Sequence, residues 1–231
     1  MAFSTSAKSR LTRHDLNRFP SKGLFDRLAR AVCEAGCLPR KELYEAWEVA
    51  RRVRRLFRGG RVVDVAGGHG LLAQTMLLLD DSSPDAYVVD PAVPSSAAKL
   101  HESLAAVWPR LAGRLHWTSA PLDAFRFEEG DLIVSSHACG SLTDFALDRA
   151  LDVRARVAVL PCCHDATTSD AGQITGWVDA ALAIDLLRAV RLQQHGYHVW
   201  TQTIPESITP KNRLLIGEPA SMRRSSAAAA C

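Results

Sequence analysis

The chain has 231 residues, of which 47% are apolar and 23% are charged, and its formal net charge is +3. These values are ordinary for a globular protein and fit one large α/β domain. No apolar run reaches membrane-spanning length, so we expect no membrane partner. The mildly basic charge permits a nucleic-acid partner without requiring one.

The N-terminal residues 1–20 are polar and basic and lack the apolar core of a secretory signal. We therefore expect a mobile N-terminus on a cytoplasmic protein. The serines and arginines of this segment keep an organelle transit peptide as the alternative. The six cysteines include no C-x-x-C pair, and in the cytoplasm they are expected to be reduced thiols.

Residues 21–58 form a predicted helical segment ahead of the main domain. Apolar residues recur at helical spacing over 25–37 and 42–57, and Pro39 separates the two stretches. We expect these helices to cover the site.

From residue 61 onward, short apolar strands alternate with helices, which predicts a doubly wound, mostly parallel α/β sheet of the Rossmann type. This domain is expected over residues 59–219, with the last two strands as a hairpin and a disordered, low-complexity tail over 220–231. The ligand crevice should lie at the carboxyl ends of the strands. Strands are expected at 61–65, 86–90, 114–119, 131–135, 157–160, 197–203 and 213–217, and helices at 71–79, 95–107, 142–151 and 174–194.

A glycine-rich turn follows the first strand, which ends at Asp64. Glycines permit unusual backbone angles and close approach of a ligand, and the N–H groups at the start of the next helix then face that ligand. The dinucleotide fingerprint G-x-G-x-x-G does not fit, because the order here is G-G-x-G. An NAD(P)-linked oxidoreductase is therefore the weaker alternative. Asp90 ends the second strand, where a carboxylate can accept hydrogen bonds from ribose hydroxyls.

The turn resembles the first motif of class I S-adenosylmethionine (SAM) methyltransferases, D-x-G-x-G-x-G, with Ala66 in place of the first glycine. In that family the loop wraps the methionine part of SAM. The resemblance implies that SAM contacts the turn, the second-strand carboxylate, the A-P-L-D segment after the third strand and the end of the fourth strand. The residues at these positions are Asp64, Ala66, Gly67, Gly68, Gly70, Asp90, Leu122, Asp123 and Ser135.

Two further motifs narrow the resemblance. H-A-C-G-S-L-T-D follows the fourth strand and P-C-C-H follows the fifth. They resemble a branch of class I methyltransferases that includes tRNA 2′-O-methyltransferases of the acceptor stem and a broad methyltransferase-domain group. The K-E-L-Y-E-A stretch, with Lys41 and Glu45, is similar to a helix of the same branch.

Candidate chemistry follows from these positions. His137 stands where a base for a hydroxyl acceptor would stand, with a pocket-shaping histidine as the alternative. Lys211, in the connection between the last two strands, could hold a phosphate or lower the pKa of a hydroxyl, with a solvated turn as the alternative. We further expect substrate contacts from Lys41, Cys139, Asp144, His164, Asn212 and Arg213.

The cysteines and histidines of these motifs raise other possibilities. Zinc is not expected, because adjacent cysteines rarely chelate one tetrahedral ion and the two clusters lie on separate strand ends. Cysteine-based cytosine methylation does not match the residues around Pro161 and Cys162, and the motif of N6-adenine methyltransferases is absent.

The sequence thus predicts a SAM-dependent methyltransferase acting on RNA, either tRNA or rRNA, with a ribose hydroxyl as one acceptor that fits. A small-molecule or protein methyltransferase is the first alternative, and a non-catalytic SAM-binding protein is the second. The sequence leaves the methylated atom and the oligomeric state open.

Overall fold

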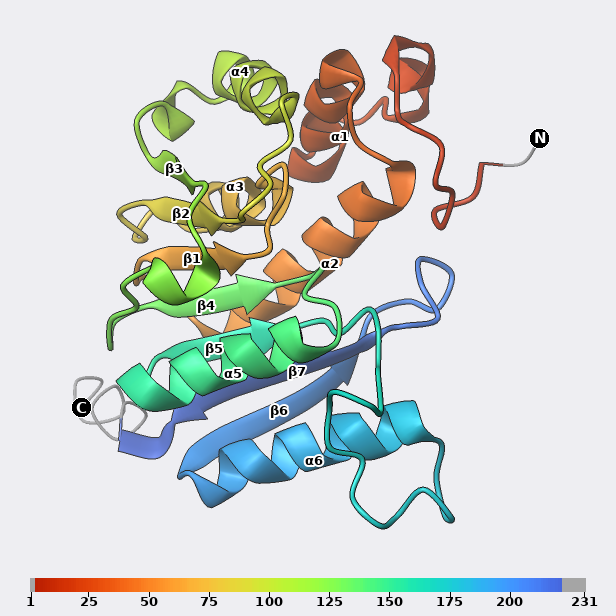
Figure 1. Ribbon diagram of the computed structural model, residues 1–231. Helices are drawn as coiled ribbons and strands as arrows, with labels where there is room; N and C mark the ends of the chain where they lie inside the picture. Colours follow the sequence, from red (N-terminus) through yellow and green to blue (C-terminus); the bar gives the residue numbers. More distant parts are fainter. Residues whose placement is uncertain (1–2, 222–231) are drawn as a thin grey trace.

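The computed structural model describes residues 3–221, and a single seven-stranded sheet runs through it (Figure 1). The strand order is β3-β2-β1-β4-β5-β7-β6, and β7 is antiparallel to both β5 and β6. This order confirms the predicted α/β sheet and its terminal hairpin. The strands are β1 (Val62–Val65), β2 (Ala86–Val89), β3 (Leu115–Thr118), β4 (Leu132–Ser135), β5 (Arg156–Val159), β6 (Tyr197–Thr203) and β7 (Arg213–Pro219).

Helices cover both faces of the sheet. Apolar side chains alternate between the faces along each strand, so Val62 and Val63 of β1 belong to different core clusters. One face packs against α1 (Leu24–Ala35), α2 (Arg40–Leu56), α3 (Leu71–Leu79) and α4 (Ala97–Val107). The other packs against α5 (Ser141–Val153) and α6 (Ala180–Gln194). No helix among residues 3–221 is both long and apolar enough to span a bilayer.

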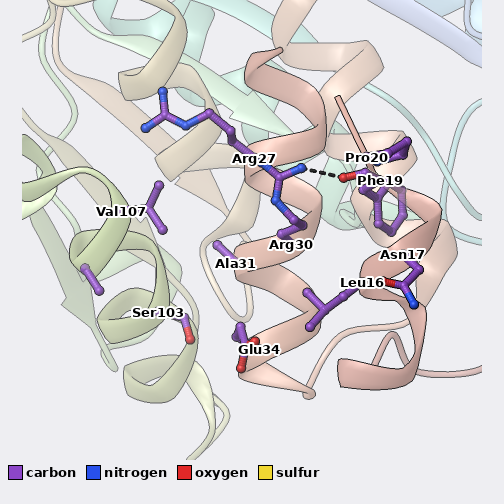
Figure 2. Close-up of a pocket in the computed structure, with 11 residues that line it drawn as sticks. Leu16, Asn17, Phe19, Pro20, Arg27, Arg30, Ala31, Glu34, Ser103 and Val107 are labelled. Atoms are coloured by element: carbon purple, nitrogen blue, oxygen red, sulfur yellow. Dashed lines mark hydrogen bonds between the residues drawn. The ribbon is translucent and has the colours of Figure 1, made fainter. Parts of the chain in front are cut away.

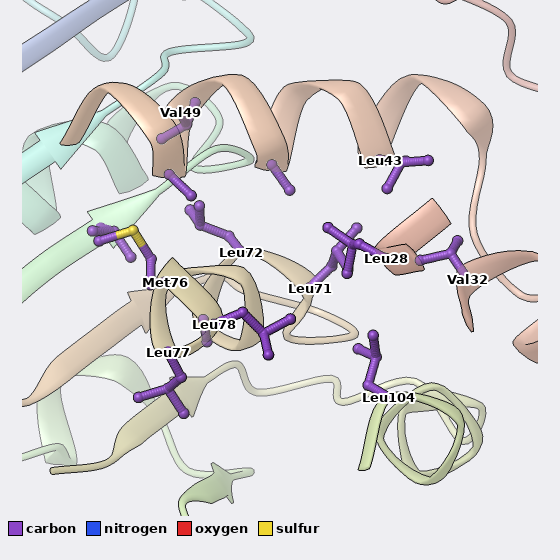
Figure 3. Close-up of a cluster of buried hydrophobic side chains, with 14 of the residues drawn as sticks. Leu28, Val32, Leu43, Val49, Leu71, Leu72, Met76, Leu77, Leu78 and Leu104 are labelled. Atoms are coloured by element: carbon purple, nitrogen blue, oxygen red, sulfur yellow. The ribbon is translucent and has the colours of Figure 1, made fainter. Parts of the chain in front are cut away.

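The larger core is built around α3, whose residues from Leu71 to Leu78 are all buried. Figure 3 shows how leucines of α3 meet Leu43 and Val49 of α2, Leu28 and Val32 of α1, and Leu104 of α4. A short helix that is apolar on every side is stable only when neighbours surround it. The N-terminal helices therefore share one core with the sheet.

Residues 3–20 are packed against the domain, which corrects the expectation of a mobile N-terminus. Leu11 is fully buried and Phe19 nearly so, and residues Arg13–Arg18 form a 3₁₀ helix, η1. The Leu11 N–H donates to the carbonyl of Leu38 at 2.9 Å. These apolar contacts and backbone hydrogen bonds hold the segment on the domain. Of the tail predicted to be disordered, residues 222–231 lie outside the described part of the chain.

The α6 helix begins at residue 180, six residues later than predicted. Asp179 caps it, because its side-chain Oδ1 accepts a hydrogen bond from the Leu182 N–H at 3.0 Å. The preceding stretch, residues 174–179, contains Gly176 and three β-branched residues, which weaken a helix.

The glycine-rich turn after β1 requires left-handed backbone angles at three positions. The φ angles are +54° at Ala66, +51° at Gly68 and +72° at Gly70. A side chain at Gly70 would also collide with Val88, whose Cγ2 would be 2.7 Å from the added Cβ. Of these three residues only Ala66 has a side chain, so it alone carries the strain of an L-residue in the left-handed region.

We expect Ala66→Gly to raise the free energy of unfolding by about 0.5–1 kcal/mol, because relief of left-handed strain exceeds the entropy that glycine loses on folding. Urea unfolding followed by circular dichroism measures this change. Ala106→Gly is the matched control, since Ala106 is exposed in α4 and should lose about 0.5–1 kcal/mol. Equal destabilisation by both variants would contradict the argument.

Candidate cofactor and acceptor site

Asp64 supports the glycine turn from behind. Its carboxylate is 1% exposed, and Oδ2 accepts a hydrogen bond from the Ala73 N–H of α3 at 3.1 Å. A Cβ at Gly67 would lie 2.7 Å from Asp64 Cγ, so glycine is required for the turn to pass over this carboxylate. Burial raises the pKa of Asp64 to about 7. The predicted cofactor contact is therefore a positioning residue for the turn.

Asp90 connects the end of β2 to the same turn. Its Oδ2 accepts a hydrogen bond from the Gly68 N–H at 3.0 Å, and its Oδ1 accepts from the Ala92 N–H at 2.9 Å. No atom lies within 4 Å of the position that a Cβ on Gly68 would occupy, so the turn is open there. Each carboxylate oxygen has a second lone pair, which leaves acceptors for ribose hydroxyls.

The remaining predicted cofactor residues follow β3 and β4. Leu122 and Asp123 lie in a short 3₁₀ helix, η3 (Leu122–Ala124), where Leu122 is buried and Asp123 is exposed. Ser135 is 1% exposed, and its Oγ accepts from the Ala138 N–H at 3.0 Å. Ser135 thus shapes the turn that carries His137.

The start of α2 lies over the carboxyl ends of β1 and β4. A small cavity of about 20 Å³ separates α2 from the glycine turn, and His137 forms part of its wall. Sequence reasoning missed three polar members of this wall, Glu42, His69 and Ser136. The sequence could have indicated Glu42 as a site residue, because it follows Lys41 in the K-E-L-Y-E-A stretch. The cavity is lined by Glu42, Ala46, Gly67, His69, Leu71, Leu72, Ser136 and His137.

Burial controls the charges around this cavity. It lowers the pKa of His137 to about 4, with a smaller contribution from the Lys41 charge, so the imidazole is neutral at pH 7. Burial and the nearby Glu45 carboxylate raise the pKa of Glu42 to about 7. Lys41 pairs with the buried Glu45 at 2.6 Å. The wall therefore offers a neutral imidazole beside a carboxyl that titrates near neutrality.

An N-terminal strap, residues 4–12, borders the start of α2. The Lys41 N–H donates to the Ala7 carbonyl at 3.1 Å, and the Arg40 N–H donates to the Ser9 carbonyl at 3.0 Å. Thr5 Oγ1 donates to the carbonyl of Ser207, in the β6–β7 connection, at 2.7 Å. Figure 1 shows this red segment beside the start of α2 and the blue β6–β7 connection. The strap therefore joins the two elements at the carboxyl end of the sheet.

Of the three predicted contact residues in the β6–β7 connection, Lys211 is the one whose side chain forms no bond to another residue among 3–221. Lys211 is exposed and forms no ion pair with any residue in the 3–221 range. Asn212 closes the connection instead, because its Nδ2 donates to the Ile204 carbonyl at 3.1 Å. Arg213 Nε pairs with Asp185 Oδ2 of α6 at 2.7 Å. Both side chains therefore have partners within the fold, and their contact with the substrate stays a prediction.

Two motif residues that we expected at the substrate also have structural partners. Asp144 of α5 pairs with Arg188 of α6 at 2.8 Å and accepts a hydrogen bond from Ser169 Oγ at 2.8 Å. His164 Nε2 lies 2.8 Å from Asp185 Oδ1. These bonds hold the β5–α6 connection against α5 and α6. Asp144 and His164 of these motifs therefore stabilise the packing of α5, α6 and the connection before α6.

The cysteines after β4 and β5 meet in space, which corrects the premise that they are separate. Cys139 Sγ lies 2.7 Å from Cys162 Sγ, and the Sγ atoms of Cys139, Cys162 and Cys163 all lie within 4.8 Å of one another. The reason is topological, because β4 and β5 are parallel neighbours whose carboxyl ends are in register.

A cavity of about 770 Å³ lies elsewhere, between η1, α1 and α4 (Figure 2). None of the predicted site residues lines it. Its wall includes Arg30, which donates a hydrogen bond to the Phe19 carbonyl and so ties η1 to α1.

Two solved structures with TM-scores above 0.5 support the fold. An O-methyltransferase family protein from Burkholderia thailandensis is 16% identical, with a TM-score of 0.53, over 91% of this chain and 63% of that one. The SAM-dependent methyltransferase SibL is 17% identical, with a TM-score of 0.51, over 91% and 66%. A putative RNA methyltransferase from Pyrococcus horikoshii is 17% identical, with a TM-score of 0.46, over 74% and 80%. The chain therefore spans less than two thirds of the length of the first two proteins.

No protein with a curated function matches the sequence. A family model described as "Methyltransferase domain" matches residues 41–169, which is more than half of the chain. The match runs from the start of α2 through the glycine turn to the loop after the C-C-H motif. The chain therefore belongs to the family of methyltransferase domains, which confirms the predicted enzyme class and its cofactor, S-adenosylmethionine.

Proposed function

We propose that this methyltransferase acts on RNA and that a cationic rim, made by Lys8, Arg10 and Lys211, holds the RNA backbone. The rim is the observation that carries the proposal. Lys8, Arg10 and Lys211 are exposed, and none of them forms an ion pair within the described residues. Free cations grouped on one edge attract phosphates, whereas cations in ion pairs are already neutralised.

The rim has a defined relation to the cofactor turn. Lys8 and Arg10 belong to the strap that runs along the first turn of α2, and the strap contacts the β6–β7 connection that carries Lys211. The Arg10 charge contributes to the lowered pKa of His69 in the turn, after burial. An RNA chain on the rim would therefore lie beside the methyl donor.

His137 is the candidate proton acceptor. SAM supplies a methyl group on a sulfonium sulfur, and an acceptor oxygen takes it in an in-line displacement. The hydroxyl proton must leave that oxygen, and the neutral imidazole of His137 can receive it. The low pKa makes His137 a weak base but keeps it unprotonated at pH 7. The ion pair with Glu45 fixes the position of Lys41, whose charge contributes to the low pKa of His137.

The substrate class is tested by methyl transfer from tritiated SAM to total cellular RNA, total protein and a metabolite extract. We expect the label in RNA. Label only in metabolites or protein would support the alternative small-molecule or protein methyltransferase. Binding of SAM without label in any fraction would support a non-catalytic protein.

Asp90→Ala is expected to weaken SAM binding by about 1.5–3 kcal/mol, because charged hydrogen bonds to the ribose and to the turn are lost. Calorimetric titration measures the affinity. Asp90→Asn is the control that retains an acceptor for the Gly68 N–H, so its loss should be smaller. Unchanged affinity in Asp90→Ala would exclude this carboxylate from the cofactor site.

Lys211→Ala should weaken RNA binding, leave SAM affinity unchanged, and reduce the slope of log affinity against log salt by roughly one. Filter binding at several salt concentrations measures the slope. Arg126→Ala is the charge-matched control, because Arg126 is exposed near the start of β1, where its carbonyl bonds Arg61. The rim is the wrong surface if both variants change the slope equally.

His137→Ala should lower kcat by about a hundredfold if His137 is the base, with both affinities nearly unchanged. Single-turnover kinetics on the labelled RNA would measure the step directly. A loss of only a few fold would assign His137 to shaping the pocket, and full activity would remove it from the reaction.

A further inference from the structure

We propose that Cys139, Cys162 and Cys163 form a three-thiolate zinc site at the carboxyl ends of β4 and β5, with the fourth coordination position open. The three Sγ atoms lie within 4.8 Å of one another. Among the described residues, no histidine nitrogen or carboxylate oxygen joins this group. Three protein ligands and a free position are the arrangement of catalytic zinc sites, whereas structural sites are closed by four.

Strand pairing and backbone hydrogen bonds hold the three thiols close together. β4 and β5 are paired in parallel, with Ser135 opposite Val159, so the segments after them run side by side. The Gly140 N–H donates to the Cys163 carbonyl at 3.2 Å, which joins the two segments next to the thiols. Arg188 donates to the Gly140 carbonyl at 3.2 Å and ties this junction to α6.

The sulfur positions are close to those that a tetrahedral ion requires. Zn–S bonds of about 2.3 Å place two thiolate sulfurs about 3.8 Å apart. The Cys162–Cys163 separation is already 3.8 Å, while the Cys139–Cys162 separation is 2.7 Å and must widen. Cys139 and Cys163 are exposed, so rotation of their side chains can supply this adjustment.

The charge balance of the site fits one divalent ion. Zinc binding would replace three thiol protons with one divalent ion and release those protons to solvent. The resulting single negative charge would face Lys41.

The site would border the acceptor side of the crevice. Cys139 follows His137 by two residues in the turn after β4, and the Lys41 charge acts on both side chains. An ion there would carry a water or an anionic ligand in its open position. This placement does not depend on RNA being the substrate, so the site can be tested independently of the proposed function.

The test is zinc binding by the reduced full-length chain after removal of metals with a chelator. We expect one zinc per chain, and we expect cobalt in its place to give the thiolate-to-cobalt absorption of a tetrahedral site. Cys139→Ser and Cys162→Ser should each weaken zinc binding by more than about tenfold. Cys37→Ala is the matched control, because Cys37 is buried beside α1 and should leave zinc binding unchanged.

Circular dichroism of each variant separates loss of the site from loss of the fold. Failure of the reduced wild-type chain to retain zinc at micromolar concentration would overturn the proposal. Equal zinc binding by the variant with all three cysteines changed to serine would also overturn it. The chain could also be isolated with a disulfide between Cys139 and Cys162. If this chain binds no zinc after reduction, the proposal is overturned and the thiols are assigned to redox chemistry instead.

Discussion

The glycine turn is held between two carboxylates, and the geometry of the site depends on this arrangement. Asp64 lies beneath the turn and bonds the first turn of α3, while Asp90 bonds the Gly68 N–H from the end of the next strand. Burial of the Asp64 carboxylate raises its pKa, and the nearby Asp90 charge adds to the rise. The turn is thus fixed by hydrogen bonds on both sides before a cofactor binds.

The α2 helix and the strap complete the crevice. Buried leucines fix α2 on α3, so the polar start of α2 is carried over the ends of β1 and β4 (Figure 3). The Lys41–Glu45 pair lies at this start, and Thr209 of the β6–β7 connection helps to offset the effect of burial on Glu45. Apolar packing on one side of α2 therefore positions charged groups on the other.

The motif residues divide into two groups by what they contact. Asp144 and His164 bond to Ser169, Arg188 and Asp185, and these bonds stabilise the packing of α5, α6 and the connection before α6. His137 and the three thiols remain at the carboxyl ends of the strands, where the thiols contact one another and none of the four side chains forms an ion pair with another residue among 3–221. A polar residue in a matched motif can thus stabilise the fold and need not contact the substrate. The residues that it bonds to distinguish these two roles.

The sequence by itself determined the elements, the cofactor turn and the enzyme class, because these depend on local patterns. Strand and helix positions follow from apolar periodicity, and the turn follows from the order of its small residues after Asp64. Tertiary structure decided which side chains meet. Arg213 found a partner in Asp185 of α6, Leu11 and Phe19 packed the N-terminus on the domain, and the pairing of β4 with β5 brought the cysteines together. These outcomes depend on contacts between residues far apart in the chain, which local patterns do not encode.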